Sequence, residues 1–139
     1  MLDLETEFGA RADRRLREDE IGWLVTVRPD GTPVPVPIWF TWDGTSILLY
    51  SQPATGKLRN IAANPRVSLH LDTDAHGDDV VVVVGTARVD DAAPRLDENP
   101  TYLDKYRERM IASFSGKFRE LADDYSVPIR IAPERISGF

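Results

Sequence analysis

The segment 56–63, GKLRNIAA, carries the most explicit chemistry in the sequence. It is predicted to be a short helix that follows a strand (47–51) and a polar loop. Thr55 is a candidate N-cap, because its hydroxyl can accept a hydrogen bond from the first free amides. Lys57 would then lie in the first turn, where the positive end of the helix dipole disfavours a cation by roughly 0.3–1 kcal/mol.

A bound anion would reverse the sign of that electrostatic penalty. The free amides, the Thr55 hydroxyl and the cations Lys57 and Arg59 would together form a phosphate socket. The alternative is a solvated helix with two exposed basic side chains. The local residues leave both interpretations open.

Composition narrows the class of protein. The chain has 139 residues, 42% hydrophobic and 29% charged, which is typical of a soluble globular protein and favours one domain over 1–139. No cysteine is present, so disulfides, thiolate catalysis and cysteine-ligated zinc are excluded. The net charge of −6 argues against general nucleic-acid binding. We expect a cytoplasmic protein without a membrane partner, because no apolar run has membrane-spanning length and the N-terminus lacks signal-peptide character.

Six strands with one helix inserted after the third indicate a mainly β fold, an antiparallel six-stranded barrel with peripheral helices. The strands are expected at 21–27, 33–41, 46–51, 67–71, 79–90 and 127–136, and the helices at 5–20, 56–63, 101–113 and 116–123. Gly85 indicates a bulge or a close backbone approach within its strand. The stripe of Tyr102, Tyr106, Met110 and Phe114 is typical of core packing.

The second strand contains prolines at alternate positions, Pro33, Pro35 and Pro37. Proline has no amide hydrogen to donate to a strand ladder, so this strand is predicted to lie at a sheet edge. The edge would either protect against aggregation or frame a ligand slot, and the sequence leaves both open.

The sequence contains no recognisable motif of catalytic side chains. Ser68, His70 and Asp72 share one strand face, but side chains two residues apart lie about 6.6 Å from each other, too far for a catalytic triad. The loop 73–79 with His76 reads as a polar turn, and no metal site is predicted. We therefore predict no catalytic side chain, so in an enzyme a bound cofactor would carry the chemistry.

Three stretches together resemble a known family. They are IGWLVTV, then PDGTPVPVPIWF followed by WDG, then LLYSQPATGKLRNIAANPRVSLHL, and the ending DYSVPIRIAPERISGF is similar too. The chain resembles the pyridoxamine 5′-phosphate oxidase-like split β-barrel superfamily. More narrowly, it is similar to the small actinobacterial deazaflavin-dependent reductases of that superfamily.

The resemblance implies a homodimer with two cofactor sites at the subunit interface. It implies that the cofactor's phosphate and ribityl end contacts Ser51, Gln52, Thr55, Gly56, Lys57 and Asn60, and that the ring lies beside Pro37, Ile38 and Trp39. Lys57 and Asn60 are three residues apart on one helical face, as joint contact requires.

The implied reaction is hydride transfer from reduced coenzyme F-420 to a small or planar organic acceptor. The alternatives are an FMN-dependent oxidoreductase of the same fold and a non-catalytic flavin- or deazaflavin-binding or storage protein. A basic track for the polyglutamyl tail of F-420 would draw on Arg130 or Arg135, although both also fit solvated strand positions.

Overall fold

The computed structural model describes residues 2–139 of the chain. Seven strands, four α-helices and one 3-10 helix lie within that range. In chain order they are α1 (Glu7–Glu18), β1 (Gly22–Val27), β2 (Pro33–Ile38), β3 (Thr41–Trp42), β4 (Ile47–Ser51), α2 (Gly56–Ala63), β5 (Arg66–Leu71), β6 (Val81–Val89), η1 (Leu96–Glu98), α3 (Pro100–Phe114), α4 (Phe118–Asp124) and β7 (Val127–Gly138).

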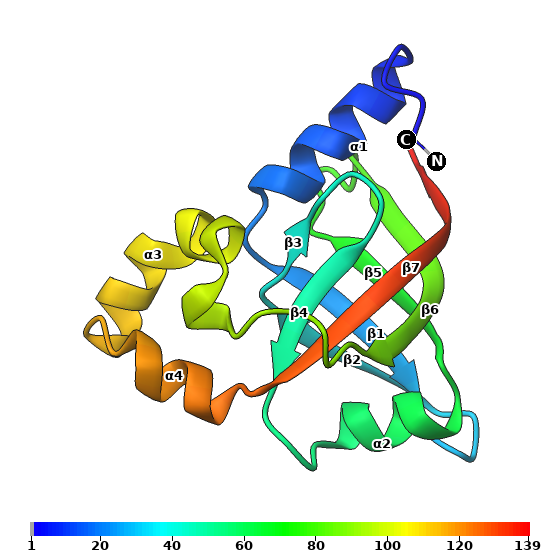
Figure 1. Cartoon of the computed structure of the whole chain (residues 1–139). Helices are drawn as coiled ribbons and strands as arrows, with labels where there is room; N and C mark the ends of the chain where they lie inside the picture. Colours follow the sequence, from blue (N-terminus) through cyan, green and yellow to red (C-terminus); the bar gives the residue numbers. More distant parts are fainter. Residues whose placement is uncertain (1) are drawn as a thin grey trace.

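The strands form one antiparallel sheet in the order β2-β1-β5-β6-β7-β4-β3, which curls into a split barrel (Figure 1). The predicted mainly β fold with peripheral helices is therefore confirmed. The strand count is corrected from six to seven, and helix α2 follows the fourth strand. The predicted strand 33–41 ends at Ile38, because the chain leaves the ladder at Trp39 and Phe40 before β3 begins.

The proline-containing strand lies at a sheet edge, as predicted. Among the described residues, β2 pairs only with β1. The prolines Pro33, Pro35 and Pro37 are opposite Val27, Val25 and Trp23 and are exposed, whereas Ile38 is buried. The strand can tolerate three missing amide hydrogens because no second strand needs them.

The buried apolar side chains form two clusters on opposite faces of β4. The inward-facing Ile47 and Leu49 belong to the barrel core, and the outward-facing Leu48 and Tyr50 pack under the helices. All five residues of β4 are therefore buried. The second cluster contains Leu96, Tyr102, Tyr106, Met110, Leu121 and Ala122. This confirms core packing for the α3 stripe, except that Phe114 at its end is 40% exposed.

Gly85 marks a bulge in β6, as predicted. The register with β7 shifts between Val84 and Gly85. A Cβ atom at Gly85 would lie 2.1 Å from the Ala132 carbonyl oxygen, so only glycine allows the two backbones to approach this closely.

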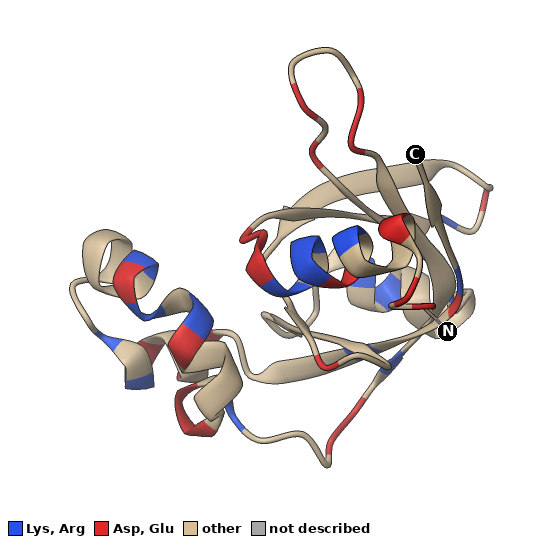
Figure 2. Cartoon of the chain, turned by 90° about the horizontal axis from the view of Figure 1, so that it is seen from above, with Lys and Arg blue, Asp and Glu red and all other residues tan. Residues whose placement is uncertain are grey.

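Charged residues lie mainly on the helices and loops, and both signs occur on α1, α3 and α4 (Figure 2). Within residues 2–139, none of the helices combines the length and the apolar character needed to cross a membrane.

Candidate functional site

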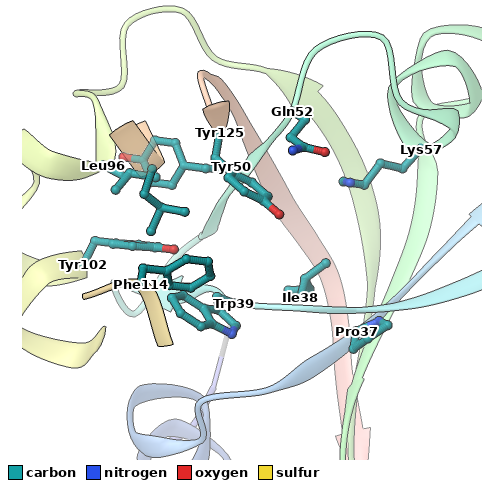
Figure 3. A pocket seen from close by; sticks show the side chains of 11 residues that line it. Pro37, Ile38, Trp39, Tyr50, Gln52, Lys57, Leu96, Tyr102, Phe114 and Tyr125 are labelled. Atoms are coloured by element: carbon teal, nitrogen blue, oxygen red, sulfur yellow. The ribbon is translucent and has the colours of Figure 1, made fainter. Parts of the chain in front are cut away.

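A pocket of about 290 Å³ lies between the barrel and the helical layer (Figure 3). The barrel side and α2 contribute Pro37, Ile38, Trp39, Tyr50, Gln52 and Lys57. The helical side contributes Leu96, Tyr102, Phe114, Leu121 and Tyr125. Strand β2, the end of β4 and the start of α2 are distant in sequence, so the barrel fold is what brings these predicted residues to one place.

Four of the predicted site residues are not among those that line the pocket: Ser51, Thr55, Gly56 and Asn60. Two of them stabilise the turn into α2. The Ser51 hydroxyl donates to the carbonyl of Gln52 at 2.7 Å and lies 3.1 Å from the Thr55 hydroxyl. They shape the loop that carries Gln52 and Lys57.

The Asn60 side chain is directed toward the barrel. Its Nδ2 donates to the Thr26 hydroxyl at 3.0 Å, and the residue is only 8% exposed. Asn60 therefore links α2 to β1 through a hydrogen bond. Lys57 lines the pocket and Asn60 does not. Sequence spacing placed them on the same helical face but could not give the direction of the Asn60 amide.

Thr55 occupies the N-cap position of α2, as predicted, but its side chain accepts no hydrogen bond from the helix. Its hydroxyl is beside Ser51 instead. The amides of Gly56, Lys57 and Leu58 consequently have no acceptor within residues 2–139, and the first backbone bond runs from the Arg59 amide to the Thr55 carbonyl. This helix end therefore offers free donors beside the pocket.

Lys57 is the cation of the site. Its side chain is half-buried, and burial lowers the pKa of its ammonium group. No carboxylate or other acceptor in the described part of the chain bonds to it. Figure 3 shows the ammonium directed into the pocket near the amide of Gln52. A desolvated cation beside free helix amides is an arrangement that an anion would stabilise.

The other basic residues near α2 each have a partner within residues 2–139. Arg59 is exposed and donates to the Ala54 carbonyl at 2.8 Å, so it closes the loop before the helix. Arg66 pairs with Glu134 at 3.4 Å. Arg130, a candidate for the basic track, donates to Asp90 at 2.7 Å.

Trp39 forms the aromatic wall of the pocket together with residues of α3. Its indole stacks on the Tyr106 ring, with centroids 4.8 Å apart and planes 4° from parallel. The Phe114 ring meets it edge-on at 6.0 Å. The Tyr106 hydroxyl accepts from the Phe40 amide at 2.8 Å and lies 2.7 Å from the Glu20 carbonyl oxygen. Tyr106 therefore fixes both the ring of Trp39 and the backbone beside it.

Sequence reasoning missed the helical half of the pocket. Tyr102 and Phe114 belong to the stripe that the sequence predicts to pack in the core, and both also border the cavity. Leu96, Leu121 and Tyr125 carried no signal, because the loop and short helix around them have no motif that indicates a binding wall.

The titratable side chains of the pocket are Lys57 and three tyrosines, Tyr50, Tyr102 and Tyr125. Burial raises the pKa of Tyr50 and of Tyr102, so both stay protonated at neutral pH. No group of three potential metal ligands comes together anywhere in residues 2–139. The site offers a cation, donors and apolar surface, which suits binding and orienting a flat anionic ligand.

This fold defines a split β-barrel protein. The chain belongs to the pyridoxamine 5′-phosphate oxidase family, whose model matches residues 8–138. No curated protein matches the sequence.

Several solved structures share the fold. One described as an F420 reductase is 26% identical, with a TM-score of 0.66 over 90% of this chain and 94% of the other. A Listeria innocua protein provisionally described as a pyridoxamine 5′-phosphate oxidase is 23% identical, with a TM-score of 0.64 over 97% of both chains. A heme storage protein from Vibrio cholerae is 18% identical, with a TM-score of 0.58 over 97% of this chain and 94% of the other.

Proposed function

We propose that this protein is an oxidoreductase that uses reduced coenzyme F-420 for hydride transfer to a small or planar organic acceptor. The observation that carries the proposal is the half-buried ammonium of Lys57, which faces the pocket without an anionic partner in residues 2–139. The similarity to an F420 reductase at 26% identity supports the choice of a deazaflavin.

The residues present fit such a cofactor. Lys57 and the free amides of Gly56 and Leu58 suit its phosphate. Ile38 and Trp39 provide a flat apolar surface for its ring. No carboxylate lines the pocket, so nothing there repels a phosphate or a ring carbonyl.

In this proposal the protein positions the reactants, and the cofactor supplies the hydride when bound. Lys57 anchors the anionic end. Trp39, held by Tyr106, orients the ring side of the pocket. Leu96, Phe114 and Leu121 exclude water from the opposite wall. No side chain acts as a nucleophile.

Two alternatives use the same pocket. An FMN-dependent oxidoreductase would place its phosphate on Lys57 in the same way. A non-catalytic binding or storage protein would need the pocket but no acceptor, and the heme storage protein of 18% identity shows that the fold is also used by a storage protein.

Titration of the purified protein with F-420 and with FMN, each followed by fluorescence, separates the cofactors. We expect F-420 to bind more tightly. Tight FMN binding without a response to F-420 would contradict the proposal.

A second experiment separates an enzyme from a storage protein. The oxidation of reduced F-420 is followed by absorbance in the presence of a set of planar acceptors. An enzyme oxidises the cofactor, whereas a storage protein binds it without turnover.

A further inference from the structure

Tyr102 has a hydroxyl group that the fold does not use. The residue is 4% exposed, and its ring packs edge-on against Tyr50 at 5.2 Å and at a tilt of 40° against Tyr106 at 4.9 Å. Its amide donates to Asn99 as part of the N-cap of α3. No hydrogen bond joins the side-chain hydroxyl to any group in residues 2–139, whereas Tyr50 and Tyr106 each have partners for theirs.

The hydroxyl oxygen must face open space. Every side-chain nitrogen and oxygen that is fully buried within residues 2–139 has a hydrogen-bond partner. An unpartnered oxygen on an otherwise buried residue therefore lies at a cavity surface, and Tyr102 borders the pocket described above. Figure 3 shows its hydroxyl directed away from α3 and toward the centre of that pocket.

Such a hydroxyl contributes no hydrogen bond to the fold. Because the hydroxyl makes no hydrogen bond within residues 2–139, phenylalanine would fill the same volume without the loss of an intramolecular hydrogen bond. Burial also raises the pKa of the Tyr102 phenol, so the group is a hydrogen-bond donor at neutral pH. The aromatic surroundings of Trp39 and Phe114 favour a flat ring as its partner.

We propose that Tyr102 is a ligand-contacting residue whose hydroxyl donates a hydrogen bond to a carbonyl oxygen of a flat conjugated ring in this pocket. The inference rests on the proposed function for the site. The carbonyl belongs either to the cofactor ring or to the hydride acceptor. In both cases the Tyr102 hydroxyl donates to a ring carbonyl, and binding experiments distinguish the two ligands.

The test compares the whole protein with Tyr102→Phe, which removes only the hydroxyl. Fluorescence gives the dissociation constants for F-420 and FMN. NMR gives those for acetophenone and ethylbenzene, two molecules of similar shape of which only acetophenone has a carbonyl. We expect Tyr102→Phe to weaken carbonyl ligands by about threefold to tenfold. If Tyr102→Phe binds F-420 or FMN more weakly than the parent protein does, the carbonyl belongs to the cofactor. If only the affinity for acetophenone falls, the carbonyl belongs to the acceptor. Ethylbenzene should bind both proteins equally.

Thermal unfolding gives the second readout. Tyr102→Phe should leave the melting temperature unchanged or raise it, whereas Tyr50→Phe, whose hydroxyl donates to the Pro94 carbonyl at 2.6 Å, should lower it. A lowered melting temperature for Tyr102→Phe, or affinities within twofold of the parent for F-420, FMN and acetophenone, would overturn the inference. If neither F-420 nor FMN binds the parent protein, the proposed function fails, and the acetophenone pair still decides the role of Tyr102.

Discussion

At the scale of single residues, Lys57 is the side chain on which the proposed cofactor site depends most. It lies at the start of α2, half-buried, beside amides that have no acceptor in the described part of the chain. Both features disfavour a cation when the pocket is empty, and both favour an anion when one binds. The arrangement is therefore better explained by a ligand than by stability.

We predict that Lys57→Ala weakens binding of F-420 by about 1.5–3 kcal/mol, because a charge-assisted contact to the phosphate is lost. Fluorescence titration measures the change. Arg59→Ala is the matched control, since Arg59 lies on the same helix but is exposed and donates to the Ala54 carbonyl. Unchanged affinity in Lys57→Ala, or an equal loss in both variants, would contradict the phosphate contact.

Lys105, on α3, is a second partly buried cation. Its Nζ donates to the Phe40 carbonyl at 2.8 Å and lies 4.0 Å from the centre of the Phe40 ring. Burial lowers the pKa of Lys105 to about 8, although the nearby carboxylates of Asp19 and Glu20 raise it. Its ordinary pKa is 10.5, so the unfolded chain binds more protons than the folded one between these two values.

We therefore predict that the free energy of unfolding, taken relative to Lys105→Met, rises with pH between about 8 and 10.5. With solvent screening taken into account, the rise should be about 1–2 kcal/mol. Urea unfolding of both proteins across this range measures the difference, and the variant cancels contributions from other titrating groups. A difference that is flat or falls with pH would exclude a buried, charged Lys105.

At the scale of elements, the break between β2 and β3 determines the shape of the pocket wall. The chain leaves the ladder at Trp39 and Phe40, so the backbone groups of Phe40 need partners from elsewhere. Helix α3 supplies them through Tyr106 and Lys105. The helix thus substitutes for a strand neighbour and holds Trp39 at the pocket.

We predict that Tyr106→Phe destabilises the protein by about 1–3 kcal/mol, because the buried Phe40 amide loses its acceptor while the stacking surface on Trp39 is kept. Chemical denaturation gives the stability, and near-ultraviolet circular dichroism reports the order of the tryptophans. The same substitution one turn earlier, Tyr102→Phe, is the control, since that hydroxyl has no partner in residues 2–139. Equal stability of the two variants would show that Tyr106 does not fix the break.

At the scale of the whole molecule, the volume of the pocket suggests that one chain forms only part of the site. About 290 Å³ is at the lower end for ligand pockets, and a cofactor with a ring, a ribityl chain and a phosphate is larger than a small substrate. The open edge of β2 borders the same region through Pro37 and Ile38. We propose that residues 1–139 act as one cofactor-binding domain and that a second copy of the chain completes the pocket.

The prediction is a homodimer in solution. Light scattering coupled to size-exclusion chromatography should give twice the mass of one chain, with and without F-420. Dilution that produces monomers should also release the cofactor. A protein with the mass of a single chain that still binds F-420 would rule out a site shared between subunits.

The sequence by itself determined the features that depend on local chemistry. Helix α2 has the predicted bounds, since Thr55 precedes it and Asn64-Pro65 ends it. The alternate prolines placed β2 at the edge, and Gly85 predicted the bulge. These follow from missing amide hydrogens, missing Cβ atoms and side-chain periodicity, which act within a few residues of each other.

Only the tertiary structure decided which side chains face the pocket. The Asn60 amide donates to the hydroxyl of Thr26, which is 34 residues away in the sequence. The Tyr106 hydroxyl accepts from the amide of Phe40, which is 66 residues away. Tyr102 and Phe114 both belong to the predicted core stripe and border the cavity, but only Tyr102 is buried. Contacts of this kind depend on how distant elements pack, and a helical periodicity gives the face of a residue but not its partner.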